Sequence, residues 1–433
     1  MIIYNVLGII IRTFFQLFYK RIYITGLENV LKDKPIFLAA NHSNALIDGY
    51  VIAVFLIGHR KSYFLGRAGI FGNKFLDWLF TTVQIIPIYR PRDGDDYTKK
   101  NVSTFEKVDK VLLENKAILI FPEGNCVKEK RLRPLKKGTV RMAFSAWEKG
   151  ADVHIIPTGI SYTQHDKARS EVMLSFGKPI PIENYRSQFE QNPTETYTAV
   201  NADLKAAIES EMVLIENVDD EFVTEQLLEI GRNDHRVTGT DFQEKGCFVM
   251  SNNSKRLELE QQIANKINRL AKEDKAQLAT LKSDVNDYFE ALKKEKITDN
   301  AVVNYQQSRS FIIRLLAPLA IVLGAVLHFP LRYFKSLARR MTQKDNTMFL
   351  TIWTALLMGF YLIFGLVLII FGILTIGFLN AFLGGVVIVV LTYGSGLILE
   401  KYKEDQANVD FKKLAIRSPK KIVALKEMRL KLK

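Results

Sequence analysis

Two hydrophobic patterns alternate along residues 22–186. Short apolar runs are separated by stretches in which apolar residues recur every three or four positions. Short runs of this kind predict buried strands, and the longer spacing predicts helices. The expected strands are 36–40, 62–65, 83–88, 117–121, 153–162 and 172–176, and the expected helices are 45–57, 69–80, 97–115 and 138–149. Strands separated by helices indicate an α/β domain with a mixed, largely parallel sheet flanked by helices.

The stretch from 187 to 307 follows a different pattern. It is polar and poor in strand formers, and within 254–297 its apolar residues fall on one face of a long helix. We expect a helical region here, folded as a hairpin or bundle that packs on itself or on the α/β domain. A coiled-coil dimer is the alternative.

The longest apolar runs lie in residues 308–400, the expected membrane region. From Phe349 to Leu399 the chain carries no charge and is long enough for two spans of about 20 residues each. A turn near 375–380 would join them into a hairpin. The expected transmembrane segments are 349–373 and 379–399.

Basic residues flank this hairpin on both sides, including a tail at 401–433. Because loops rich in Lys and Arg stay in the cytoplasm, we expect both ends of the hairpin on the cytoplasmic side. The preceding apolar segment, 311–329, is interrupted by an arginine, a proline and a histidine. We expect it to lie in the membrane interface or to re-enter, and a third span is the alternative.

Residues 1–21 are apolar but carry a basic residue in the middle, and they lack the features of a signal peptide. We expect a membrane-associated helix with embedded phenylalanines and basic side chains that reach headgroups. These residues are Phe14, Phe15 and Phe18, and Arg12, Lys20 and Arg21. A helix packed on the domain's own core is the alternative.

Composition narrows the class of partner. The chain has a formal net charge of +14 and two cysteines, Cys126 and Cys247. The charge indicates an anionic partner, and the apolar runs favour membrane lipids over nucleic acid, for which no binding motif is present. Two cysteines argue against a disulfide framework, and they leave no cysteine cluster for a metal. We expect no metal.

A polar cluster, Asn41 to Asp48, follows the first predicted strand. α/β proteins usually keep their functional groups at such strand ends. A neutral His42 can take a proton from a hydroxyl if a carboxylate such as Asp48 holds its other ring nitrogen. Helix capping by Asn41 or Ser43 is the structural alternative for those two residues.

Three further strand ends carry groups suited to an anionic substrate. One strand leads to Arg90, which can bind phosphate oxygens bidentately or be an ordinary surface arginine. Another leads to Glu123 and Gly124, where the glycine lets a ligand approach the backbone. A basic loop that includes Lys136 then precedes a helix start, which would attract an anion. The last of these strands contains Pro157.

These clusters, in this order, resemble the motifs of the glycerol-phosphate and lysophosphatidate acyltransferase family of phospholipid synthesis. The resemblance covers roughly residues 20–180. The matching residues are Asn41, His42 and Asp48 in the first motif, Ile86 to Arg90 in the second, Phe121 to Gly124 in the third and Pro157 in the fourth.

The resemblance implies a role for each motif. His42 would be the general base on the acceptor hydroxyl, and Asp48 would orient it. Arg90 would bind the acceptor phosphate, and the Phe-Pro-Glu-Gly motif would help to bind the glycerol-phosphate. Pro157 would line the acyl or coenzyme A side. The family also implies the glycerol-phosphate acyltransferase fold for residues 22–186.

One departure from the family concerns the first motif. Five residues separate His42 from Asp48, where the family commonly has four. On a regular helix one extra residue rotates the carboxylate by about 100°, which an early turn at Ser43 and Asn44 would absorb. This spacing, together with the Ile-Pro-x-x-Arg-Pro motif at 86–91, resembles the fungal-type glycerol-3-phosphate and dihydroxyacetone-phosphate acyltransferase branch. Asn125 also replaces the family's serine or threonine.

The expected function is a membrane-bound O-acyltransferase whose catalytic domain faces the cytoplasm. It would move a fatty acyl group from acyl-CoA or acyl carrier protein to a hydroxyl of glycerol-3-phosphate or 1-acyl-glycerol-3-phosphate, with no cofactor. One alternative is an acceptor without phosphate, such as an aminolipid or another lyso-lipid. The other is a non-catalytic lipid-binding membrane protein on the same fold.

Overall fold

The structure is a computed structural model, which describes residues 2–56, 62–237, 248–250, 255–305, 311–343 and 346–432. The chain forms two compact units. The sheet unit comprises Met1–Glu216 and Lys245–Gln261, and the helical unit comprises Asn217–Glu244 and Gln262–Lys433. The sheet unit therefore runs past residue 186, and the stretch 187–307 is divided between the two units. Cys247 lies outside the described residues.

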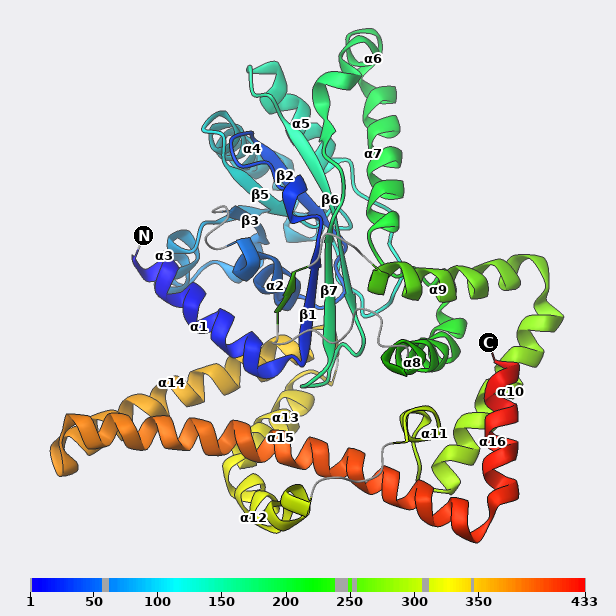
Figure 1. Cartoon of the computed structure of the whole chain (residues 1–433). Helices are drawn as coiled ribbons and strands as arrows, with labels where there is room; N and C mark the ends of the chain where they lie inside the picture. Colours follow the sequence, from blue (N-terminus) through cyan, green and yellow to red (C-terminus); the bar gives the residue numbers. More distant parts are fainter. Residues whose placement is uncertain are drawn as a thin grey trace. The chain divides into compact units, whose positions relative to one another are not determined.

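The described strands of the sheet unit form one mixed sheet (Figure 1). They are β1 (Arg21–Thr25), β2 (Ile36–Ala40), β3 (Ser62–Arg67), β4 (Ile85–Ile88), β5 (Ala117–Ile120), β6 (His154–Tyr162), β7 (Glu171–Phe176), β8 (Ile180–Pro181) and β9 (Phe248–Met250). Their order is β4-β3-β5-β2-β6-β7-β1-β9, with β8 beside β6. Neighbours run parallel except where β6 meets β7 and β8. The predicted mixed, largely parallel sheet is confirmed.

Helices cover this sheet because its central strands are apolar on both faces. All five residues of β2 are buried, as expected for an inner parallel strand. The helices are α1 (Ile2–Phe18), α2 (Leu46–Leu56), α3 (Lys74–Thr82), α4 (Tyr97–Leu113), α5 (Gly138–Glu148), α6 (Arg186–Gln191) and α7 (Pro193–Ser210). One core joins Phe37 and Ile155 of the sheet to Phe144 of α5 and Leu204 of α7. This shared core is why the unit extends to α7.

The N-terminal helix corrects one expectation. Phe15 and Phe18, which we expected to enter the membrane, are 1% and 5% exposed and face the protein. Phe15 stacks on Tyr19, and α1 packs against α2. An amphipathic helix buries its apolar face wherever apolar surface is available, and here the sheet unit supplies that surface. Ile9 and Leu17 remain exposed, so membrane association of α1 stays a prediction.

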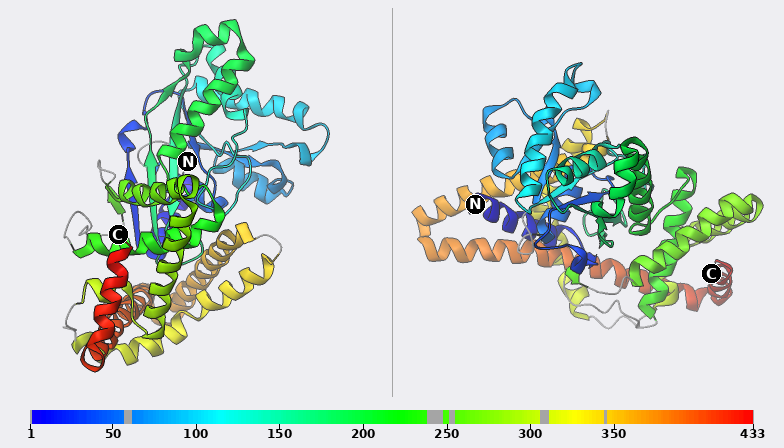
Figure 2. Two further views of the ribbon diagram at one scale, coloured as in Figure 1. Left: turned by 90° about the vertical axis from the view of Figure 1, so that its right-hand side faces the viewer. Right: turned by 90° about the horizontal axis from the view of Figure 1, so that it is seen from above.

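The helical unit contains the expected bundle. Its helices include α8 (Glu221–Val237), α9 (Lys255–Glu273, from Gln262 on), α10 (Lys275–Lys294), α11 (Asp299–Val303) and α16 (Pro419–Lys431). The long helix predicted over 254–297 ends at Glu273, where the Asp274 side chain accepts from the N–H of Gln277 and starts α10. α10 and α16 lie side by side (Figure 2). Of the residues expected as a basic tail, 401–417 thus form the end of α15 and 419–431 form the packed helix α16.

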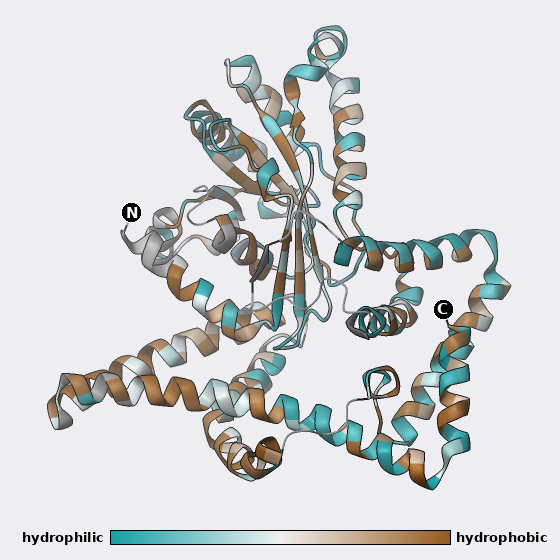
Figure 3. Cartoon of the chain, viewed as in Figure 1, coloured by the Kyte–Doolittle hydropathy of each residue, from teal (hydrophilic) through white to brown (hydrophobic). Residues whose placement is uncertain are grey.

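The remaining helices include long apolar segments. They are α12 (Phe311–Leu327), α13 (Phe329–Met341), α14 (Phe349–Ile376) and α15 (Phe378–Arg417). The apolar segments are α12, α14 and the first half of α15. Two of the described helices, α14 and α15, are long and apolar enough to cross a membrane, and α12 with α13, bent by 48°, would make a third span if counted together. The turn predicted near 375–380 is confirmed at Gly377, where φ is +81°. In Figure 3, α14 and the start of α15 are brown, and the end of α15 turns teal.

Candidate active site

The sheet brings the first and third motifs together. β2 and β5 are parallel neighbours, so the residues that follow them meet at one edge of the sheet. The backbone N–H of His42 donates to Oε1 of Glu123 at 2.6 Å. The imidazole stacks on Phe121, with ring centroids 4.0 Å apart. The position and plane of the histidine ring are therefore set by the neighbouring strand.

Asp48 reaches His42 in spite of the extra residue between them. Nδ1 of His42 lies 3.0 Å from Oδ2 of Asp48. The Asp48 side chain is fully buried, whereas that of His42 is 17% exposed. The pair therefore has the arrangement of a base held by an orienting carboxylate, with the base partly open to solvent and its partner closed off.

A tight turn absorbs the extra residue, as expected. Ala45 has a φ of +49°, and α2 begins only at Leu46. Oδ2 of Asp48 accepts the backbone N–H groups of Ser43 at 2.9 Å and Asn44 at 2.7 Å. The N–H of Ala45 donates to Sγ of Cys126 at 3.0 Å. One buried carboxylate thus shapes the turn and holds the histidine at the same time.

Tyr162, at the end of β6, completes this group of side chains. Its hydroxyl donates to Oδ1 of Asp48 at 2.7 Å. Burial, and then the charge of Asp48, raises the pKa of Tyr162 well above its usual value. The hydroxyl therefore stays protonated and remains a donor. No local pattern in the sequence marks Tyr162 as a site residue, although it ends the strand of the fourth motif.

Asn41 has a structural role in this site. Its amide donates to the carbonyl of Ile160 at 2.9 Å and accepts the N–H of Ile160 at 2.7 Å. These bonds extend the pairing between β2 and β6 by one step beyond the end of β2. Asn41 therefore fixes the approach to His42, and it does not cap the following helix.

The buried carboxylate of Glu123 links two backbone segments by hydrogen bonds. Its second oxygen, Oε2, accepts the N–H of Arg133 at 3.0 Å. Burial raises the pKa of Glu123 to about 7. The backbone hydrogen bonds from His42 and Arg133 lower this pKa, but their effect is smaller than that of burial. Because both oxygens already hold backbone donors, Glu123 shapes the loop. Direct substrate binding by Glu123, which the resemblance implied, stays a prediction.

Gly124 and Lys136 meet in the same loop. Gly124 has a φ of +65°, which favours glycine, and a Cβ there would lie 3.5 Å from Cγ of Lys136. The N–H of Lys136 donates to the carbonyl of Pro122 at 2.8 Å, and the side chain is exposed. The backbone near Gly124 is therefore open beside a cationic side chain.

Arg90 lies on the same edge of the sheet but at a distance from His42. β4 is three strands from β2, roughly 14 Å at about 4.8 Å per strand. The guanidinium donates to both oxygens of Asp93, at 3.2 and 3.1 Å, and lowers the pKa of that carboxyl. Arg67, the last residue of β3, is aligned with Ile88, and its charge also acts on Asp93. Two arginines thus gather here, and only Arg90 was predicted from the sequence.

Pro157 is buried within β6, aligned with Ala39 of β2. Its carbonyl accepts the N–H of Gly177 at 2.8 Å, where β6 leaves β2 and turns to β7. It shapes the strand that carries Tyr162. The acyl-side role implied for Pro157 stays a prediction.

Among the described residues, His42, Asp48 and Cys126 carry metal-ligand atoms within 4.8 Å of one another. Their donor atoms are already used within the protein: Asp48 Oδ2 accepts two backbone N–H groups and lies against His42, and the thiol accepts the N–H of Ala45. Burial also raises the pKa of Cys126 to about 12, so the thiolate that a metal prefers is disfavoured. This donor set fits a hydrogen-bonded site better than a metal site.

Comparisons with known proteins agree with this geometry. Residues 21–161 match the model of the acyltransferase family. The chain is 31% and 36% identical to glycerol-3-phosphate O-acyltransferases 2 and 1 of Saccharomyces cerevisiae, over 28% and 22% of its length and 16% and 13% of theirs. It is 30% identical to a chloroplastic 1-acyl-sn-glycerol-3-phosphate acyltransferase of Brassica napus, over 31% of this chain and 37% of that one.

Among solved structures, the chain is similar to the 1-acyl-sn-glycerophosphate acyltransferase PlsC of Thermotoga maritima. The TM-score is 0.34 at 16% identity, over 46% of this chain and 77% of that one. The match of residues 21–161 to the acyltransferase family model and the curated relatives confirms the resemblance seen in the sequence for this part of the chain. The chain matches well under half of the length of its curated relatives.

Proposed function

We propose that this chain is a membrane-bound O-acyltransferase of phospholipid biosynthesis. It transfers a fatty acyl group from a thioester to a hydroxyl of glycerol-3-phosphate or 1-acyl-glycerol-3-phosphate. The acyltransferase domain and the names of the similar proteins support this reaction class. The observation that carries the proposal is the 3.0 Å contact between His42 Nδ1 and the buried carboxylate of Asp48.

The proposed chemistry needs one base and no covalent intermediate. With Nδ1 held by Asp48, Nε2 of His42 takes the proton of the acceptor hydroxyl while the oxygen attacks the thioester carbon. The C–O bond forms, the C–S bond breaks, and the proton passes from His42 to the leaving thiolate. General-base help of this kind contributes about 100- to 10,000-fold. Acyl-CoA or acyl carrier protein is the co-substrate, and no cofactor is required.

The phosphate of the acceptor is proposed to bind at the cationic part of the same edge. Arg90 and Arg67 lie there at the ends of β4 and β3, and the exposed Lys136 lies beside the open backbone of Gly124. Asp93 holds the Arg90 guanidinium in a fixed plane. Arginines in a fixed plane favour bidentate binding of a phosphate over binding of a neutral headgroup.

The membrane location rests on α14 and α15, whose apolar residues are largely exposed. Exposed apolar surface on this scale is stable only in lipid or against another protein. The basic residues at both ends of this hairpin favour the cytoplasmic side for both ends, so we propose a cytoplasmic catalytic domain.

An acceptor screen tests the proposal. The purified full chain is reconstituted in lipid with radiolabelled acyl-CoA or acyl carrier protein, and offered glycerol-3-phosphate, 1-acyl-glycerol-3-phosphate, an aminolipid and a lyso-lipid without a terminal phosphate. Product with a phosphate acceptor, absent in His42→Ala, is the expected result. Transfer only to the acceptors without a terminal phosphate would contradict the proposed substrate, and binding without turnover of any acceptor would indicate a lipid-binding protein.

A further inference from the structure

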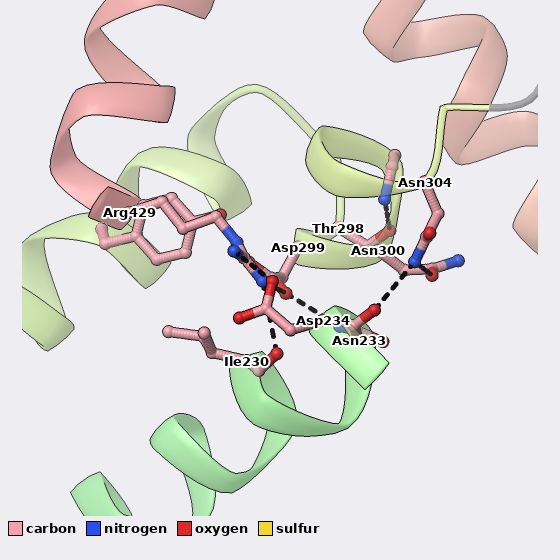
Figure 4. A network of polar contacts seen from close by, with 10 residues as sticks. Ile230, Asn233, Asp234, Thr298, Asp299, Asn300, Asn304 and Arg429 are labelled. Carbon is pink, nitrogen blue, oxygen red and sulfur yellow. Dashed lines mark hydrogen bonds and ion pairs between the residues drawn. The ribbon is translucent and has the colours of Figure 1, made fainter. Parts of the chain in front are cut away.

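The segments before and after the apolar helices are held together in the helical unit. Arg429 of α16 donates from Nε and Nη2 to the two oxygens of Asp299, at 2.7 and 3.1 Å. Its Nη1 donates to Asp234 of α8 at 2.8 Å (Figure 4). Asp299 is fully buried, and Tyr288 and Asn233 also donate to it. Charges buried this completely are stable only when they are paired, so α16 is fixed to the elements that precede α12.

The hydrophobic core leads to the same conclusion. Ile422 and Leu425 of α16 are buried in one core with Val285 and Leu292 of α10. A single folded core outside the membrane lies on one side of it. Because the chain leaves this core before α12 and returns to it after α15, the number of membrane crossings between them must be even. The hairpin of α14 and α15 supplies two, so α12 and α13 supply none.

The contacts of α12 and α13 give the path of this pair. Arg314 near the start of α12 pairs with Asp405, in the charged part of α15, at 3.0 Å. His328 at its end lies 3.0 Å from the carbonyl of Thr392, in the apolar part. Along α12 the chain therefore moves toward the apolar part of the hairpin.

α13 returns in the opposite sense. Phe334, in its first half, packs on Phe360, well inside α14. Arg339, in its last turn, lies over Phe349, the first residue of α14, at 5.8 Å. The pair thus enters and leaves at the same end of the hairpin.

The small bend makes this path shallow. The axes of α12 and α13 differ in direction by only 48° at their junction. Because one helix slopes into the leaflet and the other slopes out, their two angles to the membrane plane add up to at most 48°. A mean slope of about half that over a helix of 17 residues reaches a depth of about 10 Å, at about 1.5 Å per residue. That depth corresponds to the boundary between headgroups and acyl chains.

The two faces of α12 fit this position. Ala317, Ala320 and Gly324 are buried, and a Cβ on Gly324 would lie 2.8 Å from Leu399 of α15. On the other side, an apolar stripe with helical spacing is more than half exposed. Its residues are Ile312, Leu315, Leu319, Val322 and Val326. The stripe needs an apolar partner, and the exposed apolar surface of the hairpin lies beside it.

α13 supplies the polar complement. Tyr333 is exposed in its first half, and Arg339 and Arg340 are exposed in its last turn. An aromatic side chain followed by paired arginines suits the membrane interface, where the ring lies at headgroup level and the cations meet phosphate.

We propose that α12 and α13 form a shallow wedge in the leaflet that the hairpin enters, and that Arg339 and Arg340 bind the headgroups of anionic phospholipids. The wedge rests on the proposed membrane placement of α14 and α15, but not on the acyl-transfer chemistry.

Labelling of single cysteines from one side of the membrane tests the path. The full chain, with C126S and C247S, is reconstituted in sealed vesicles and treated with an impermeant maleimide. Gln343→Cys is expected to label to the same fraction as Lys293→Cys and Lys420→Cys, and Leu379→Cys at the hairpin turn to the complementary fraction. Labelling of Gln343→Cys with the complementary fraction would overturn the wedge. Equal labelling at all four sites would instead overturn the membrane hairpin itself.

Hydrogen exchange of the wild-type chain tests the wedge even if the cysteine-free variant does not fold. Both α12 and α13 are expected to exchange more slowly in lipid discs than in detergent. Equal exchange in the two environments would contradict the wedge.

The headgroup preference has its own measurement. A fluorophore on Gln343→Cys is quenched with brominated phosphatidylglycerol or brominated phosphatidylcholine. We expect stronger quenching by phosphatidylglycerol, lost in Arg339→Gln/Arg340→Gln and kept in the matched pair Lys412→Gln/Lys413→Gln on α15. Equal quenching by both lipids in the parent, or an equal loss in both pairs, would overturn the role of these arginines.

Discussion

Tyr162 and His42 hold opposite oxygens of one buried carboxylate. The Tyr162 hydroxyl donates to Oδ1 of Asp48 at 2.7 Å, and Nδ1 of His42 lies 3.0 Å from Oδ2. With one oxygen fixed by the tyrosine, the carboxylate cannot rotate away from the imidazole. Tyr162 is therefore a positioning residue for the proposed base.

Replacing Tyr162 with Phe tests this role. A hydrogen bond to a charged group contributes about 1.5–3 kcal/mol, so kcat is expected to fall about 10-fold or more. KM for both substrates should not change, because the tyrosine does not contact them in this account. Tyr185→Phe, which removes a similar bond to Asp203 on the surface of the same unit, is the control. A rise in KM at constant kcat would contradict the positioning role.

The turn at Ala45 gives a second prediction. Its N–H has Sγ of Cys126 as acceptor, and leaving a buried donor unpaired costs about 1–3 kcal/mol. Cys126→Ala is expected to lower both thermal stability and kcat, because Asp48 depends on this turn. Cys126→Ser keeps an acceptor and should restore most of both. If Ser and Ala behave alike in unfolding and kinetic assays, the thiol has no such role.

Glu123 should make stability depend on pH. Burial raises its pKa in the folded protein to about 7, above the usual 4.5. The folded state then binds the proton more tightly than the unfolded state, so stability is gained as pH falls through 7 and lost as pH rises. Between pH 7.5 and 5.5 the gain is on the order of 2 kcal/mol. Unfolding followed over this range should show the gain in the wild type but not in Glu123→Gln. If the wild type and Glu123→Gln show the same pH dependence of stability, Glu123 is not the group that causes it.

Arg90→Ala tests the phosphate site. Losing a charge-assisted, bidentate contact is expected to raise KM for the phosphate acceptor roughly 10- to 100-fold and to leave KM for the acyl donor unchanged. Arg90→Lys should recover only part of the loss, because an ammonium is a point charge without the planar fork of donors that pairs with two phosphate oxygens. Arg186→Ala removes an exposed arginine of the same unit as the control. Equal effects on both substrates would argue against the role.

The strands and the cluster at 41–48 are predictable from the sequence because they depend on local patterns. The contacts that complete the site are not local. Tyr162 lies 114 positions from Asp48, and Cys126 lies 81 positions from Ala45. Only the strand order brings them together, and no local spacing encodes that order. Arg67 was missed for the same reason.

The packing of the N-terminal helix and of the tail was not predicted, for a different reason. A helix on a membrane and a helix on a protein core have the same amphipathic pattern, so Phe15 and Phe18 do not reveal which surface they face. In residues 401–433 the apolar positions by which α16 joins the core, such as Ile422 and Leu425, are few among many basic residues. The segment therefore has the pattern of an exposed basic tail.

Acyl transfer by His42→Ala tests most directly whether His42 is the base of the reaction. The matched control is His154→Ala, which removes a histidine that contacts Asp152 near the start of β6. Both variants should unfold like the wild type and stay with the membrane fraction. His42→Ala is expected to lose at least about 100-fold in kcat, as removal of a general base predicts, and His154→Ala should keep its activity. Wild-type turnover by folded His42→Ala would contradict the role of His42 as general base.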